Sequence, residues 1–128
     1  MIYALDTNIV SYILRGNNDV ILRWRQEESR RNASIIPLIV YYEIKRGLEA
    51  NNSKSRLKYF ESLCDKLGVD LLTIPDIDVG ARIYAARKRQ GHSIEDAAVC
   101  VRGGYTLVTN NTKHFEGIEG LRLVDWTK

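Results

Sequence analysis

The sequence predicts an α/β protein, a three-layer α/β/α domain around a mostly parallel central sheet. Two observations favour this class. Short apolar segments alternate with amphipathic helical stretches, and polar side chains directly follow several of the apolar segments. Strands separated by helices typically form a parallel sheet, because each helix returns the chain to the start of the next strand. The length of 128 residues fits a single domain, 1–128, that can bury a core of its own.

Five short segments have the composition of strands. The first ends on the carboxylate of Asp6, and the last alternates apolar with polar residues. Apolar runs of this length between turn residues are typical of buried strands. The expected strands are 1–6, 33–37, 71–75, 105–109 and 121–126.

The segments between these strands carry apolar residues at helical spacing. Thr7 or Asn8 can cap the first helix. In the second helix, Val20 and Trp24 mark the apolar side, which leaves Glu27 on another side. The expected helices are 8–15, 19–30, 37–51, 53–67, 76–90 and 97–102, the last after a capping box at 93–96, with a turn or helical turn at 110–115.

The composition excludes several classes of protein. A hydrophobic fraction of 45% with a net charge of only +3 argues against disorder. Cys64 and Cys100 lack the spacing of a disulfide framework or a zinc site. The longest apolar run, 35–42, is far shorter than the about 20 residues of a membrane span. Asp6 interrupts the one candidate signal sequence, so we expect a cytoplasmic protein without a membrane partner.

Polar side chains after the strands are the candidate site. The carboxyl ends of parallel strands meet at one edge of a sheet, where ligands bind. Asp6 follows the first strand, Glu43 lies on the helix after the second, Asp96 precedes the fourth, and Asn111 follows it. Two plain alternatives stay open: Asp6 could simply cap a helix, and Glu43 could face solvent and pair with Arg46.

Carboxylates that converge repel one another unless a cation neutralises them. Carboxylate and amide oxygens without a Cys or His cluster suit Mg²⁺ or Mn²⁺, which can polarise a phosphodiester and activate a water. Lys45, Arg46 and Lys113 lie near these positions and could bind the phosphates of RNA. His92 and His114 lack metal-ligand spacing, and we expect them at the surface and packed beside Phe115, respectively.

Several motifs together resemble the PIN-domain ribonuclease toxins of the VapC type. The resemblance runs nearly from end to end and rests on 5–8, 42–47, 91–97, 106–115, 120–121 and 125–126. It implies the three-layer fold and Mg²⁺- or Mn²⁺-dependent endonucleolytic cleavage of RNA, often tRNA. It also implies a homodimer and a VapB-type antitoxin that covers the site.

The resemblance also implies roles for individual residues. Asp6 matches the first acidic position of the family and Glu43 the second. Asn111 matches the last polar position, where relatives carry Asp or Asn. The supporting polar residues near the site would be Thr7, Asn8 and Thr109.

One departure from the family pattern concerns the third acidic residue. Ala98 stands where that Asp would fall, and the stretch 98–104 is shorter than in the family by roughly five residues, about one and a half helical turns. Asp96 could substitute for the missing ligand, or it could only cap a helix. Two hypotheses follow: an active metal-dependent endoribonuclease, or a catalytically impaired PIN module that still binds antitoxin or RNA.

A third hypothesis ignores the family and places Asp6 in a phosphatase or receiver-like domain. Such sites usually need a second Asp close by, and the segment 5–8 lacks it. Hydrolysis of small phosphoesters, or phosphorylation by them, would be the sign of this class.

Overall fold

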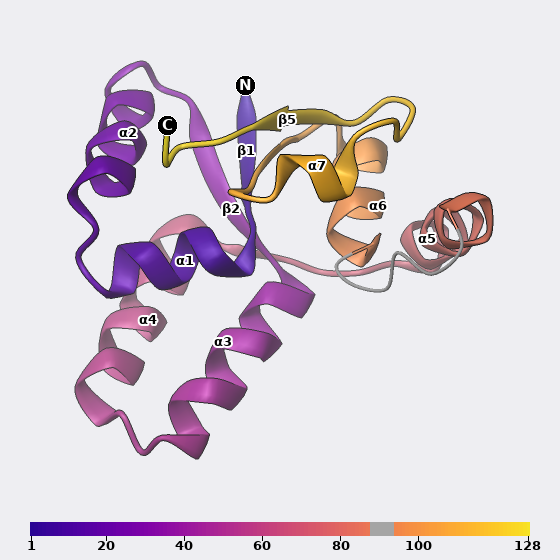
Figure 1. Cartoon of the computed structure of the whole chain (residues 1–128). Coiled ribbons are helices and arrows are strands. Elements are labelled where there is room, and N and C mark those ends of the chain that lie inside the picture. Colours follow the sequence, from indigo (N-terminus) through magenta and orange to yellow (C-terminus); the bar gives the residue numbers. More distant parts are fainter. Residues whose placement is uncertain (88–93) are drawn as a thin grey trace.

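A parallel sheet forms the centre of the structure, a computed structural model that describes residues 1–87 and 94–128 (Figure 1). The five described strands are arranged in the order β3-β2-β1-β4-β5, and every neighbouring pair is parallel. This confirms the predicted α/β class. The strands are β1 (Ile2–Leu5), β2 (Ala33–Pro37), β3 (Val69–Asp70), β4 (Thr106–Val108) and β5 (Arg122–Val124).

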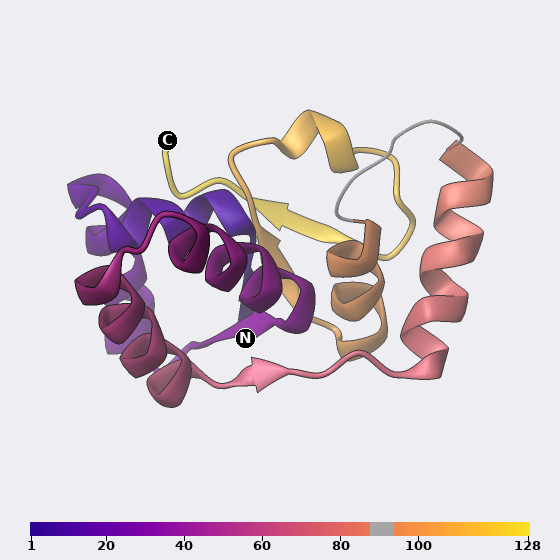
Figure 2. The same ribbon diagram turned by 90° about the horizontal axis from the view of Figure 1, so that it is seen from below.

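Helices cover both faces of this sheet, which gives the predicted three layers. Seen from below, α1 to α4 gather on one side, and α5 and α6 lie on the other (Figure 2). The helices are α1 (Thr7–Leu14), α2 (Asn18–Ser29), α3 (Leu38–Ala50), α4 (Lys54–Leu67), α5 (Ile74–Arg87), α6 (Ile94–Gly103) and α7 (Thr112–Phe115).

The side chains of the strands alternate between two cores. Leu5, Ile36 and Val108 point into the core beneath α1 to α4. Ala4 and Leu107 point into the second core, beneath α6 and α7. Because both faces of the sheet are buried, the strands read as nearly continuous apolar runs. This is why the sequence alone located most of them.

The expectation for the third strand was wrong by a few residues. Gly68 ends α4 at φ +88°, a conformation that glycine adopts without strain. The chain then pairs at once with β2, so β3 is Val69–Asp70 rather than 71–75. The segment beyond it enters α5 at Ile74, where Asp76 accepts a hydrogen bond from the backbone N–H of Thr73 at 2.9 Å.

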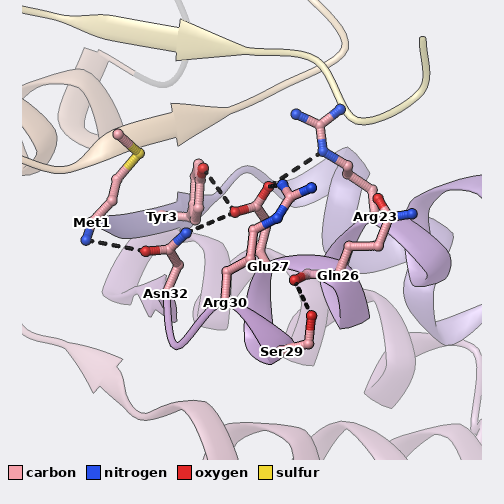
Figure 3. Close-up of polar contacts among 8 residues, drawn as sticks. All are labelled: Met1, Tyr3, Arg23, Gln26, Glu27, Ser29, Arg30 and Asn32. Atoms are coloured by element: carbon pink, nitrogen blue, oxygen red, sulfur yellow. Dashed lines mark hydrogen bonds and ion pairs between the residues drawn. The ribbon is translucent and has the colours of Figure 1, made fainter.

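Glu27 departs from the expectation that it lies on a polar helix side, since its side chain is only 3% exposed. Asn32 and Tyr3 donate hydrogen bonds to its Oε1 at 2.8 and 3.2 Å (Figure 3). Arg30 and Arg23 donate to Oε2 at 3.2 and 3.4 Å. The carboxylate therefore joins α2 to β1 and to the turn before β2.

Helices α5 and α6 pack closely against each other. Asp76 on α5 is buried and forms an ion pair with Arg102 on α6. Helix α6 begins at Ile94, earlier than the expected start at 97. The expected helix end at 88–90, Ser93 of the capping box, and His92 lie outside the described residues. Among the described helices, none has the length and apolar character that crossing a bilayer requires.

Candidate active site

An open cleft of about 210 Å³ lies at the carboxyl edge of the sheet. It is formed where β1 passes into α1, beside α3 and α7. The residues that line it are Asp6, Thr7, Asn8, Glu43, Asn111, His114 and Phe115. Five of the positions expected from the sequence therefore come together.

Asp6 occupies the point where β1 becomes α1. Its Oδ1 accepts a hydrogen bond from the backbone N–H of Thr7 at 2.8 Å, which caps the helix. Its Oδ2 accepts one from the hydroxyl of Thr109 at 2.8 Å. The side chain is buried but reaches the cleft. Asp6 is thus both a helix cap and a residue of the cleft, so the two interpretations do not exclude each other.

Glu43 reaches the cleft from α3. The hydroxyl of Thr7 donates a hydrogen bond to its Oε1 at 2.7 Å. Arg46, which was the expected ion-pair partner of a solvent-facing Glu43, lies over the ring of Tyr42, with its guanidinium carbon 5.1 Å from the ring centroid. The two carboxylates of the cleft are therefore joined through one threonine, whose N–H binds Asp6 and whose hydroxyl binds Glu43.

The asparagines after β4 complete this edge. The backbone N–H of Asn111 donates to the hydroxyl oxygen of Thr109 at 3.1 Å. Asn110 accepts a hydrogen bond from the amide of Asn8 and donates one to the hydroxyl of Tyr12, both at 3.2 Å. Asn110, which directly follows Thr109 at the end of β4, thus holds Asn8 in place.

Asp96 is placed differently from Asp6 and Glu43. It is fully buried in the first turn of α6 and is not among the residues that line the cleft. Burial raises the pKa of the Cys100 thiol, and the charges of Asp96 and Asp6 raise it further. Both carboxylates therefore act on the same buried thiol. In residues 1–87 and 94–128, no three His, Cys, Asp or Glu side chains gather closely enough to hold a metal.

The three cations expected to bind RNA are not among the residues that line the cleft. The Nζ of Lys45 donates to the hydroxyl of Tyr41 at 3.3 Å, and the Tyr41 ring packs against Phe60 of α4. Arg46 and Lys113 are exposed on α3 and α7. Their role in RNA binding stays a prediction.

His114 was expected only to pack beside Phe115, and it does so with ring centroids 5.0 Å apart. It also lines the cleft beside the carboxylates. The spacing of His114 from Asn111 could have predicted this position, because residues three apart lie on the same side of a helical turn. In the structure the backbone N–H of His114 donates a hydrogen bond to the Asn111 carbonyl at 3.1 Å.

The donor set of the cleft fits a hard divalent cation. Asp6 and Glu43 offer carboxylate oxygens, and Asn111 offers an amide oxygen. Mg²⁺ is commonly held by one or two carboxylates and keeps several waters. Two carboxylates in an open cleft therefore meet its needs, although Asp6 already accepts two hydrogen bonds.

The fold and the cleft define an α/β protein with an oxygen-rich candidate cation site at the carboxyl edge of its sheet. The family model described as PIN domain matches residues 3–121. The chain therefore belongs to the PIN-domain family, as the sequence motifs suggested.

Named relatives extend this assignment. The chain is 31% identical to Ribonuclease VapC2 of Rickettsia felis over 140 aligned residues, which cover all of both proteins. It is 26% identical to the tRNA(fMet)-specific endonuclease VapC of Shigella flexneri, covering 98% of each. Among solved structures, VapBC-1 from nontypeable Haemophilus influenzae superposes with a TM-score of 0.83 at 25% identity and full coverage of both chains.

Proposed function

We propose that the chain is an endoribonuclease toxin that cleaves RNA in the cleft between α1, α3 and α7. The observation that carries the proposal is the pair of carboxylates, Asp6 and Glu43, which Thr7 holds together in an open cleft. The two relatives are named as a ribonuclease and a tRNA-specific endonuclease, and these names support the same activity.

The reaction would depend on Mg²⁺ or Mn²⁺. Asp6, Glu43 and Asn111 are the residues that would hold the ion. When bound, such an ion polarises a phosphodiester and lowers the pKa of a coordinated water. Thr7 and Thr109 fix the orientation of the two carboxylates through their hydrogen bonds. His114, at the wall of the cleft, is placed to donate a hydrogen bond to a phosphate oxygen.

Asp96 would serve as the third acidic residue in place of the one missing at Ala98. Its support is its place in the sequence, two positions before Ala98, and its buried carboxyl group in the first turn of α6. The matching test is Asp96→Asn. A loss of Mn²⁺ affinity would support the role, whereas unchanged affinity would limit the metal site to Asp6 and Glu43.

The names of the relatives support a proposal for the substrate and for one partner. We propose tRNA as the RNA, on the name of the Shigella flexneri relative, and a VapB-type antitoxin, on the VapBC structure. We also propose a homodimer in the cytoplasm. Exposed apolar side chains on one helix support the dimer: Ile74, Ile77 and Tyr84 of α5 are 76, 52 and 56% exposed.

A second candidate function is a catalytically impaired PIN module that still binds antitoxin or RNA. The observation that favours it is the position of the acidic residues. Ala98 is fully buried where the family pattern has Asp, and Asp96 is not among the residues that line the cleft.

The deciding experiment is cleavage of total tRNA by the purified chain in Mg²⁺ or Mn²⁺, beside EDTA and an Asp6→Asn variant. Cleavage that requires both the metal and Asp6 supports the nuclease. If the folded protein cleaves nothing but still binds RNA or a co-expressed VapB-type antitoxin, the impaired module is the correct function.

A further inference from the structure

A second groove, of about 360 Å³, opens from the cleft between α1, α3 and α4. Thr7 and Glu43 line both spaces, so the hydrogen bond between them forms the boundary. A ligand that fills the groove would end beside Glu43, next to the cleft that Asp6 lines. The groove and the cleft therefore share one wall, which Thr7 and Glu43 form.

Charge divides this groove into two ends. Arg15, at the end of α1, and Arg56, in the first turn of α4, line the end away from the cleft. Of the described residues that line the groove, Glu43 is the only acidic one, and it stands at the cleft. The guanidinium of Arg15 lies 5.4 Å from the centroid of the Tyr12 ring, and its Nε donates to the Ser11 carbonyl at 3.4 Å.

The floor of the groove is open at Gly47. A Cβ built on this residue would meet no atom within 4 Å. A glycine inside a helix costs about 1 kcal/mol relative to alanine. Packing does not explain this cost, because a methyl group would fit. Gly47 lines the groove together with Ile44 and Leu48, so a large side chain there would take up part of its space.

We propose that this groove binds the single-stranded segment of RNA next to the cleaved phosphodiester, with Arg15 and Arg56 contacting its phosphates. The proposal rests on the proposed ribonuclease function and adds a path for the substrate. Guanidinium groups attract the phosphates at the far end, while the carboxylates at the near end repel them unless a cation is bound. The apolar side chains of the groove, Leu14, Ile44 and Leu48, suit a base or a ribose.

Salt dependence of RNA binding tests the two arginines without any turnover. A fluorescein-labelled single-stranded RNA is titrated in EDTA at several salt concentrations, and log K is plotted against log salt. Each phosphate contact to a single strand contributes a slope of about −0.7. We expect the Arg15→Gln/Arg56→Gln variant to flatten the slope by about 1.4. Arg25→Gln, at an exposed position on α2, is the matched control and should leave it unchanged.

Filling the groove is the second, independent test. Gly47→Leu should weaken RNA binding at least about tenfold, or about 1.4 kcal/mol. Gly47→Ala, whose methyl group meets no neighbour, should bind RNA like the wild type. Both variants favour the helix, so circular dichroism should show each of them folded.

The groove and the ribonuclease function can fail separately. If the wild type cleaves RNA with metal while the arginine and leucine variants keep its RNA affinity and salt slope, the groove proposal is wrong and the nuclease stands. If the variants keep RNA affinity but no longer co-purify with a co-expressed VapB-type antitoxin, the groove binds protein, and the proposal is also overturned. Loss of RNA binding in a chain that cleaves nothing supports the groove and rejects the nuclease.

Discussion

Thr7 donates its hydroxyl hydrogen to Oε1 of Glu43 over 2.7 Å, while its backbone N–H is bound by Asp6 at 2.8 Å. One residue thereby fixes two carboxylates that come from different elements. Asp6 ends a strand and Glu43 lies inside a helix, so their relative position depends on how α1 packs against α3. The hydroxyl of Thr7 links α1 to α3 at this point.

Removing this hydroxyl should therefore damage the site more than the fold. Thr7→Val keeps the shape of the side chain and the backbone N–H that binds Asp6, but it frees Glu43. Residues that orient metal ligands typically contribute 10- to 100-fold in metal affinity or activity. We expect a loss of about this size in Mn²⁺ affinity and in RNA cleavage.

Thr7→Ser is the matched control, because it retains the hydroxyl and should keep most of the wild-type affinity. Circular dichroism would show whether both variants fold. Equal losses in the valine and serine variants would mean that the hydrogen bond to Glu43 does not matter.

Thr109 should contribute to stability as well as to the orientation of Asp6. It is fully buried and donates the hydrogen bond that Oδ2 of Asp6 accepts. Thr109→Val leaves a buried carboxylate oxygen without this donor, so the free energy of unfolding should fall by about 1–3 kcal/mol. Urea denaturation measures it. Thr127→Val, which removes a hydroxyl bonded to Asp125 near the last residue, should change it by less than about 0.5 kcal/mol.

Glu27 should make stability depend on pH in the acid range. Burial raises the pKa of its carboxyl, but hydrogen bonds from Asn32, Tyr3 and Arg23 lower it more, so the net pKa lies below its ordinary value. A depressed pKa means that the stabilisation is complete above the unfolded-state pKa, about 4.3. It is lost as the pH falls through the folded-state pKa.

The matched variant for this prediction is Glu27→Gln. We expect it to lower the free energy of unfolding at pH 7 by about 2 kcal/mol, because its donors lose a charged acceptor. The difference between wild type and variant should shrink as the pH falls below about 4. Urea titrations at several pH values measure this, and a difference that stays constant down to pH 3 would argue against the network.

Gly103 should not tolerate a side chain. A Cβ at this position would stand 2.6 Å from the ring atoms Cε2 and Cζ of Tyr105. Gly103→Ala forces the ring to move, so we expect a loss of about 1–3 kcal/mol in spite of the better helix propensity of alanine. Thermal melting measures it. Gly47→Ala, which meets no neighbour, should instead raise the melting temperature; similar shifts in both variants would contradict the steric argument.

The sequence predicted the sheet well for a physical reason. Both faces of β1 and β4 are largely buried, so these strands are mostly apolar and stand out from the amphipathic helices. The short strand β3 has no such run. Its place depends on the turn at Gly68 and on pairing with β2, and neither is visible in local periodicity.

The sequence predicted those residues of the site whose place depends on their position relative to the end of a strand. Asp6 and Asn111 come shortly after the ends of β1 and β4. Glu43 lies on α3, the helix that follows β2. The hydrogen bond from Thr7 and the place of His114 depend on packing between elements far apart in sequence. Glu27 was misplaced for the same reason, because donors on β1 and on the turn before β2 surround it.

The most direct test of this account is the affinity of the chain for Mn²⁺, because it requires no knowledge of the RNA. Titration followed by the electron paramagnetic resonance signal of free Mn²⁺ would compare the wild type with Asp6→Asn and Glu43→Gln. The account predicts a site in the wild type that each substitution weakens at least about tenfold. Equal Mn²⁺ affinity in all three proteins would contradict the assignment of this cleft as the metal site.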